Sequence, residues 1–155
     1  MARNIEQELA TLIDSVQQAG ARVRELVRDG FEVQTKADHS PVTTVDHEVN
    51  RILHDMQRRE FPSDGWLSEE SPDDLARLDH DRVWIIDPID GTRALVNRVP
   101  EFCISAALIE RGFPVVAAIL NPSTDELFTA VRGGGLFLNG SRVTLSPLHD
   151  FDPVI

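Results

Sequence analysis

One stretch restricts the possible folds more than any other: an apolar run that ends in two closely spaced acids. Residues 83–86 read Val-Trp-Ile-Ile, which is typical of a buried strand. Asp87 and Asp90 follow it, and Pro88 between them fixes its own φ and favours a turn. We therefore expect the two carboxylates to face the same small volume at the end of this strand.

This pair of acids favours a site for a divalent cation and a phosphate. Two unneutralised carboxylates so close together repel each other, whereas Mg²⁺ prefers oxygen ligands of this kind, and the carbonyl of Ile89 lies between them. Gly91 and Thr92 add backbone N–H groups and a hydroxyl, which suit a bound phosphate. The alternative is an ordinary Asp-Pro turn on the surface, but the full string after an apolar strand favours the metal–phosphate site.

Two amphipathic helices are predicted before this stretch. Apolar residues recur at helical spacing over about residues 4–29, and Gly30 fits a C-terminal cap. Residues 31–35 alternate apolar and polar side chains and suggest a short strand, and residues 36–41 are expected to form a loop. A second helix begins at Thr43 or Thr44, and Thr43 with Asp46 fits a capping box. Asp46 therefore has two interpretations, a capping carboxylate or a catalytic group, and spacing alone favours the first.

A second acidic pair follows another predicted strand. Residues 66–68 form a brief apolar segment that ends in Glu69 and Glu70, and a short helix is expected over about residues 71–78. If the strands before Glu69 and Asp87 are neighbours, both acidic ends share one edge of the sheet. The alternative is that Glu69 and Glu70 are only a solvated pair.

The chain after Thr92 is typical of serial hairpins. Residues 102–110 and 113–120 are joined by Arg111-Gly112, another strand is expected over 127–131, and Asn139-Gly140 is a strong hairpin turn before a last strand over 142–145. Serial hairpins form an antiparallel sheet, and the two long helices can cover one face of it. The predicted fold class is therefore α+β, with two long helices packed on a mainly antiparallel sheet.

Composition excludes several classes of function. The net charge is −11, from 26 acidic and 15 basic residues, which argues against a nucleic-acid polymer as partner because phosphate backbones need basic patches. The one cysteine, Cys103, excludes an intrachain disulfide and lies in an apolar run, as small core residues do. There is no transmembrane segment by length and nothing resembles a signal peptide, so a cytoplasmic location is expected.

Other catalytic chemistries have little support in the sequence. The five histidines are scattered, and His47 and His54, seven apart on the second predicted helix, are typical of surface residues. There is no G-x-S-x-G motif, and Cys103 has no basic neighbour that would activate it. A metal-activated water needs only carboxylates and a hydroxyl, which this chain has.

Together these motifs resemble the magnesium-dependent, lithium-sensitive phosphatase superfamily that includes inositol monophosphatases and 3′(2′),5′-bisphosphate nucleotidases. Four strings carry the resemblance in the family's order: Ser40-Pro41-Val42-Thr43 through Asp46, Leu67-Ser68-Glu69-Glu70, residues 84–92, and Asn139-Gly140 after a glycine-rich bend. The first two strings, with Glu101-Phe102, look most like the bacterial bisphosphate nucleotidase branch. That branch removes the 3′-phosphate of 3′-phosphoadenosine 5′-phosphate, a by-product of sulfur assimilation, and inositol monophosphatase is the alternative.

The resemblance implies a Mg²⁺ centre built from four residues. Glu69 and Asp87, with the carbonyl of Ile89, would hold one ion. Asp87 and Asp90 would hold a second, and Glu69 would also touch a third, water-rich ion.

The resemblance also implies catalytic and substrate-binding roles. Asp46 and Thr92 would position and deprotonate the attacking water, with Glu69 as a further catalytic group. The amides of Gly91 and Thr92, beside Asp90, would bind the phosphate of a small-molecule phosphate ester.

One departure from the family pattern affects the whole prediction. The family's catalytic domain is followed by a second domain that supplies another metal-binding aspartate in a Trp-Asp motif, and no such motif follows Asp90 here. Residues 1–155 are therefore expected to be the N-terminal domain alone, with weak or no turnover. The second alternative is a non-catalytic metal-binding half-domain that self-associates through the surface left uncovered.

Overall fold

Two long helices pack against each other behind a sheet. α1 (Ile5–Asp29) begins after Asn4, whose side chain accepts a hydrogen bond from the N–H of Glu6, and α2 (Thr44–Glu60) begins after Thr43. The computed structural model describes residues 4–73 and 75–144, and both helices lie where their apolar periodicity predicts. Among these residues, no helix combines the length and the apolar character needed to cross a membrane.

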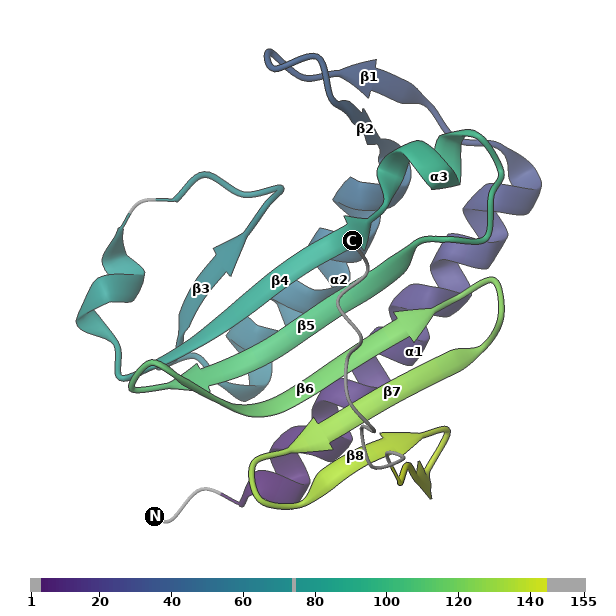
Figure 1. Cartoon of the computed structure of the whole chain (residues 1–155). Coiled ribbons are helices and arrows are strands. Elements are labelled where there is room, and N and C mark those ends of the chain that lie inside the picture. Colours follow the sequence, from purple (N-terminus) through teal and green to yellow (C-terminus); the bar gives the residue numbers. More distant parts are fainter. Residues whose placement is uncertain (1–3, 74, 145–155) are drawn as a thin grey trace, which may run out of the picture.

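The sheet has seven strands, arranged in the order of the chain. Its strands are β3 (Gly65–Ser68), β4 (Arg82–Asp90), β5 (Cys103–Glu110), β6 (Phe113–Asn121), β7 (Glu126–Val131), β8 (Gly135–Leu138) and β9 (Ser141–Arg142). Neighbouring strands are antiparallel except for β3 and β4, which are parallel. The predicted fold class, two long helices on a mainly antiparallel sheet, is confirmed (Figure 1).

The core lies between the helices and one face of the sheet. Trp84, Ile104 and Leu108 come from the central strands and are fully buried against Leu12 and Leu53 of the two helices and their neighbours. Each large apolar side chain buried in this way stabilises the fold by about 1.5–3 kcal/mol. This packing fixes β4, and with it the acids at its end, relative to α2.

The other face of the sheet is apolar, and neither long helix covers it (Figure 1). Ile85, Ala107 and Ala117 are paired across β4, β5 and β6, and Ile119 is paired with Phe128 of β7. Because paired residues point to the same side of a sheet, these five form one continuous patch. Ile85 and Ile119 are 41% and 43% exposed. We call this patch the open face.

The helix predicted over residues 71–78 does not form. A single 3₁₀ turn, η1 (Ala76–Asp79), takes its place and follows Leu75, whose left-handed backbone (φ 63°) is incompatible with a continuing helix. The hydroxyl of Ser71, the first residue of the expected helix, accepts a hydrogen bond from Asn50 Nδ2 at 3.0 Å. A tertiary contact has therefore overridden a local helix signal.

The hairpins after β4 follow the prediction, with a shorter final strand. Asn139 and Gly140 both have positive φ, at 48° and 79°, as the predicted turn requires. β9 ends at Arg142, and Leu145, which was predicted to end this strand, lies outside the described residues. So do Asp74 of the expected 71–78 helix and residues 147–155, for which no helix or strand was expected.

Two small elements near the end of β4 were predicted only in part. β1 (Val33–Thr35) lies within the strand expected over residues 31–35, but it pairs with β2 (Pro41–Thr43) in an antiparallel hairpin, whereas residues 36–41 were expected to be only a loop. α3 (Thr92–Val96) is a short helix where strands were expected to follow at once. Figure 1 shows the hairpin and α3 together at the end of β4, so both lie beside the predicted site.

Candidate active site

The acids of the opening stretch belong to β4 itself, so the predicted turn at Pro88 is wrong. Asp87 pairs with Ser105 and Asp90 pairs with Cys103, so β4 advances three residues (87 to 90) where β5 advances two (105 to 103). Residues three apart on a regular strand point to opposite faces, and the one extra residue of this bulge returns both acids to the same side. Pro88 is tolerated because a bulge leaves a residue without ladder hydrogen bonds.

The position of Asp87 disfavours its negative charge. Burial, then the nearby charges of Glu69 and Asp90, raises the pKa of Asp87 to about 6. Its Oδ1 atom is buried and has no hydrogen-bond partner among the described residues. A buried charged oxygen without a partner is costly, and a bound cation would remove that cost.

The chain turns sharply after Asp90, at a position that only glycine can occupy. Gly91 has a left-handed backbone with φ of 94°, and a Cβ added there would lie 2.7 Å from the carbonyl oxygen of Glu101. A side chain at this position would therefore be excluded twice, by backbone strain and by collision. The turn places Thr92 at the start of α3, directly beside the acids.

Asp46 caps α2 with one carboxylate oxygen and contacts Thr92 with the other. Its Oδ2 accepts hydrogen bonds from the N–H and the hydroxyl of Thr43, at 2.8 and 2.6 Å, which completes the predicted capping box. Its Oδ1 lies 3.0 Å from Thr92 Oγ1, which is also 3.0 Å from the carbonyl oxygen of Ile89. The single hydroxyl proton of Thr92 can be donated to either acceptor. Asp46 is therefore a cap whose second oxygen contacts the predicted catalytic hydroxyl.

Glu69 follows β3 at the same edge of the sheet as Asp87. β3 pairs in parallel with β4, and the N–H of Glu69 donates to the carbonyl of Ile86 at 3.3 Å, so the condition under which both acidic ends share one edge of the sheet is met. The carboxylates of Glu69 and Glu70 both contact Lys36 Nζ, at 2.9 and 2.5 Å. Lys36 comes from the β1–β2 hairpin and was missed, because nothing in its local sequence indicates a partner 33 residues away.

These groups line an open cavity of about 300 Å³. Its lining residues are Ser40, Pro41, Glu69, Asp87, Ile89, Asp90, Gly91, Thr92 and Arg93. Sequence reasoning quoted Ser40 and Pro41 without giving them a role, and it overlooked Arg93, an exposed cation at the start of α3. All the predicted metal and phosphate residues therefore lie around one cavity, with Asp46 buried behind Thr92.

The donor chemistry of this cavity fits a hard divalent cation. Carboxylates and a carbonyl oxygen are the ligands that Mg²⁺ takes, and Asp87 Oδ1 is a buried oxygen without a hydrogen-bond partner among residues 4–73 and 75–144. Within residues 4–73 and 75–144, no three acid, histidine or cysteine side chains are already gathered as a metal cage. Glu69 contacts Lys36 instead, so its carboxylate would have to exchange that partner for a metal ion.

Cys103 borders the site rather than filling the core. It is only partly buried and pairs with Asp90 across β4 and β5. Burial, followed by the charges of Asp90 and Asp87, raises the pKa of the Cys103 thiol to about 11. The thiol is therefore protonated at neutral pH and is a poor nucleophile, as the sequence indicated.

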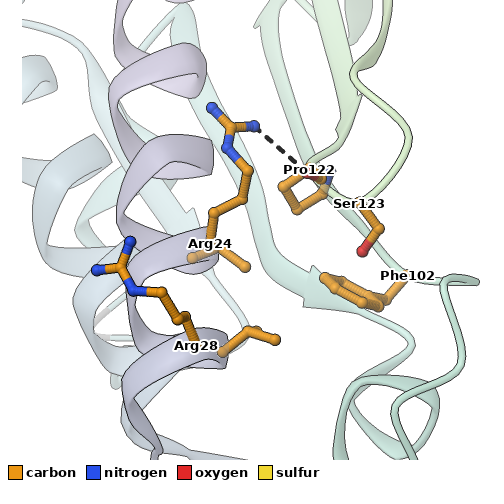
Figure 2. A pocket seen from close by; sticks show the side chains of 7 residues that line it. Arg24, Arg28, Phe102, Pro122 and Ser123 are labelled. Carbon is orange, nitrogen blue, oxygen red and sulfur yellow. Dashed lines mark hydrogen bonds between the residues drawn. The ribbon is translucent and has the colours of Figure 1, made fainter.

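A second cavity, of about 330 Å³, lies between α1 and the turn after β6. Figure 2 shows Arg24 and Arg28 of α1 on one side and Phe102, Pro122 and Ser123 on the other, with the Arg24 guanidinium donating to the carbonyl of Pro122 at 3.3 Å. Arg24 also pairs with Asp125 at 2.8 Å, and Arg28 pairs with Asp29 at 2.7 Å. Both cations are thus already neutralised by carboxylates, and this cavity has no acid cluster of the kind found at the end of β4.

Comparison with known proteins agrees with the motifs. The model of the inositol monophosphatase family matches residues 4–152. Nus factor SuhB of Escherichia coli K12 is 38% identical over 127 residues, covering 82% of this chain and 47% of that protein. Inositol-1-monophosphatase of Rhizobium meliloti is 38% identical over 140 residues, covering 87% of this chain and 51% of that protein.

The fold agrees with a solved structure as well. A crystal structure described as an IMPase/NADP phosphatase complexed with Mg²⁺ and phosphate matches with a TM-score of 0.83 and 26% identity, over 90% of this chain and 53% of that one. The chain thus spans about half the length of the curated relatives it matches. The family match extends over nearly the whole sequence, and on that ground the chain belongs to the inositol monophosphatase family.

Proposed function

We propose that this chain forms the metal- and phosphate-binding part of a Mg²⁺-dependent phosphomonoesterase that acts on a small-molecule phosphate ester. One observation carries the proposal: Asp87 faces Glu69 and Asp90 with a raised pKa, beside Thr92, and one of its oxygens is buried without a hydrogen-bond partner in the described part of the chain. Such a cluster of carboxylates destabilises the fold when no cation is bound, and a divalent cation would neutralise it. Family membership and the relative complexed with Mg²⁺ and phosphate support the same proposal.

In this proposal, Glu69, Asp87, Asp90 and the carbonyl of Ile89 hold Mg²⁺. The bound ion would supply charge neutralisation of the phosphate oxygens and a lowered pKa for a water molecule.

The remaining steps are carried by the chain's own groups. Thr92 Oγ1 accepts a hydrogen bond from the attacking water and passes its own proton toward Asp46 Oδ1, 3.0 Å away. Thr43 holds the other oxygen of Asp46 in place through two hydrogen bonds. The amides of Gly91 and Thr92, with Asp90 nearby, orient the substrate phosphate at the start of α3.

Two substrates follow from different observations. The strings around Ser40 and Glu69 favour 3′-phosphoadenosine 5′-phosphate, the substrate of the bisphosphate nucleotidase branch. Two of the similar proteins, from Rhizobium meliloti and Solanum lycopersicum, are named as inositol monophosphatases, which favours an inositol monophosphate. The shared chemistry is hydrolysis of a phosphate monoester, and only an assay separates the two.

The test is phosphate release from both esters, with Mg²⁺ or with a chelator in its place. Thr92→Val, which keeps the shape of the side chain and removes the hydroxyl, is the matched variant. We expect Mg²⁺-dependent release from one ester, slowed by about 10²–10⁴-fold in the variant, as general acid–base contributions are. Phosphate release at the same rate with Mg²⁺ and with the chelator, or at the same rate in Thr92→Val and the unsubstituted chain, would contradict the proposal.

A second candidate is a non-catalytic metal-binding module that self-associates. The open face favours it, because two of its large apolar side chains, Ile85 and Ile119, are exposed. Large exposed apolar patches mark interaction surfaces. This candidate predicts Mg²⁺ binding without phosphate release, together with oligomers that Ile119→Glu converts to monomers. Sedimentation of the unsubstituted chain as a monomer would count against it.

A further inference from the structure

The turn that carries Glu69 is held from behind by a side chain of α2. Asn50 projects from that helix, and its amide makes hydrogen bonds to both flanks of the turn. Its Oδ1 accepts from Ser68 Oγ at 2.6 Å, and its Nδ2 donates to Ser71 Oγ at 3.0 Å. A longer contact, at 3.4 Å, joins Nδ2 to the carbonyl oxygen of Glu70.

The hydroxyls of the turn extend this network. Ser68 Oγ also accepts from the N–H of Glu70 at 3.3 Å, and Ser71 Oγ also accepts from Trp66 Nε1 at 3.4 Å. The side chain at position 50 must therefore accept a hydrogen bond on its Ser68 side and donate one on its Ser71 side. An amide provides both, whereas a carboxylate has no N–H for the Ser71 side and an alkyl group has neither.

Asn50 and Asp46 lie four residues apart on α2, and side chains at this spacing share one face of a helix. Asp46 contacts Thr92 Oγ1 at 3.0 Å, on the β4 side of the site. Asn50 contacts the Ser68–Ser71 turn, on the β3 side. One rigid helix thus fixes both sides of the acid cluster relative to each other.

We propose that Asn50 is a positioning residue for the metal centre, which holds the backbone of the Glu69 turn in register with Asp87 without touching the ion. The inference rests on the proposed function, since it assumes that Glu69 and Asp87 bind a divalent cation. Residues behind metal ligands typically change metal affinity by 10–100-fold when they are removed. Because Glu69 is exposed and contacts Lys36, the backbone of its turn is what limits where its carboxylate can reach.

Asn50→Leu tests this, because leucine has nearly the same size and no polar atoms. We expect the dissociation constant for Mg²⁺, measured by titration calorimetry on the whole chain, to rise about tenfold. The constant for Ca²⁺ is expected to rise less than about threefold, because Ca²⁺ tolerates irregular geometry and Mg²⁺ demands a near-ideal octahedron. A general loss of structure would weaken both ions alike, and that result would overturn the proposal.

Two further variants keep the test decisive. Asn139→Ala is the matched control: its Oδ1 accepts from the N–H of Leu127 at 2.9 Å in another turn, so it loses an amide without affecting the site. It should leave Mg²⁺ affinity unchanged, and an equal loss there would overturn the proposal. Ser68→Ala removes one partner of Asn50, and its effect should not add to that of Asn50→Leu, since coupled residues are non-additive.

The outcomes separate this inference from the proposed function. If the unsubstituted chain shows no saturable Mg²⁺ binding, the metal centre itself is absent and both fail. If it binds Mg²⁺ and Asn50→Leu binds it equally well, only the positioning role fails. Should Asn50→Leu not fold, Ser68→Ala alone must weaken Mg²⁺ more than Ca²⁺, and an unchanged ratio would overturn the proposal.

Discussion

The acids at the two ends of β4 differ in whether a basic side chain neutralises them. At the start, Arg82 pairs with Glu8, with Asp64 at 3.7 Å and with Glu110 at 2.9 Å, and the side chains of Glu8 and Asp64 are almost completely buried. At the other end, none of the described lysine or arginine side chains forms an ion pair with Asp87. The fold therefore supplies a cation for the buried acids at the start of β4 and one for Glu69 and Glu70, but none for Asp87 among the described residues.

The difference also bears on stability. A buried ion network is costly to break, because removing one partner leaves an unpaired buried charge. Removing a carboxylate that has no cation beside it should instead raise stability, because the repulsion from neighbouring carboxylates is relieved. Substitutions at the two ends of one strand should thus change stability with opposite signs.

The largest effect is expected at the start of β4. Arg82→Met should lower the free energy of unfolding by about 3–5 kcal/mol, because it removes a positive charge that the buried carboxylates of Glu8 and Asp64 both contact. Urea unfolding measures this. Arg51→Met is the control, since Arg51 forms only exposed pairs with Glu48 and Asp55, worth about 1 kcal/mol or less. Equal losses in the two variants would contradict the contrast.

The opposite sign is expected at the end of β4. Asp87→Asn should raise the free energy of unfolding by about 1–2 kcal/mol at pH 7 in the presence of a chelator, because it removes a carboxylate whose pKa is raised to about 6. Asp81→Asn is the control, since Asp81 is exposed and only pairs with Arg111. A loss of stability in Asp87→Asn would show that the site needs no cation.

The effect of Asp87→Asn on stability should depend on pH. A raised pKa means that folded Asp87 holds its proton more tightly than the unfolded chain does, so its contribution to stability is largest below the ordinary value of 3.8 and falls until about pH 6. The stability advantage of Asp87→Asn should therefore be near zero at pH 3.5, grow between pH 4 and 6, and stay constant above. Unfolding curves across this range would contradict the assignment if the advantage were constant throughout.

The smallest effect is expected at Lys36. Lys36→Met should strengthen Mg²⁺ binding by about two- to fivefold, because Glu69 and Glu70 lose the internal cation that competes with the ion. Arg28→Met removes the same charge far from the site, beside Asp29, and should change the affinity little. Weaker Mg²⁺ binding in Lys36→Met would show that the lysine assists the centre instead of competing with it.

The sequence predicted what depends on pattern and spacing. Apolar periodicity located both long helices, Asn139-Gly140 located a hairpin, and the acids after two apolar runs located the site. These features depend on local preference and alternate burial, which are visible along the chain.

What the sequence did not predict depends on contacts between distant segments. The expected helix over residues 71–78 is absent from the described part of this segment, where Ser71 instead accepts a hydrogen bond from Asn50. Pro88 is accommodated by a bulge that depends on pairing with β5. Lys36 could not be placed because its partners lie more than 30 residues away. Neither local propensity nor composition encodes such pairings.

The central claim is that the acids at the end of β4 are arranged for a divalent cation. Titration calorimetry of Mg²⁺ at pH 7.5 into the chain and into Asp87→Asn tests it most directly. The account predicts saturable binding to the unsubstituted chain and none to the variant, although the variant is the more stable protein without metal. Binding that is absent from both, or equal in both, would contradict the claim.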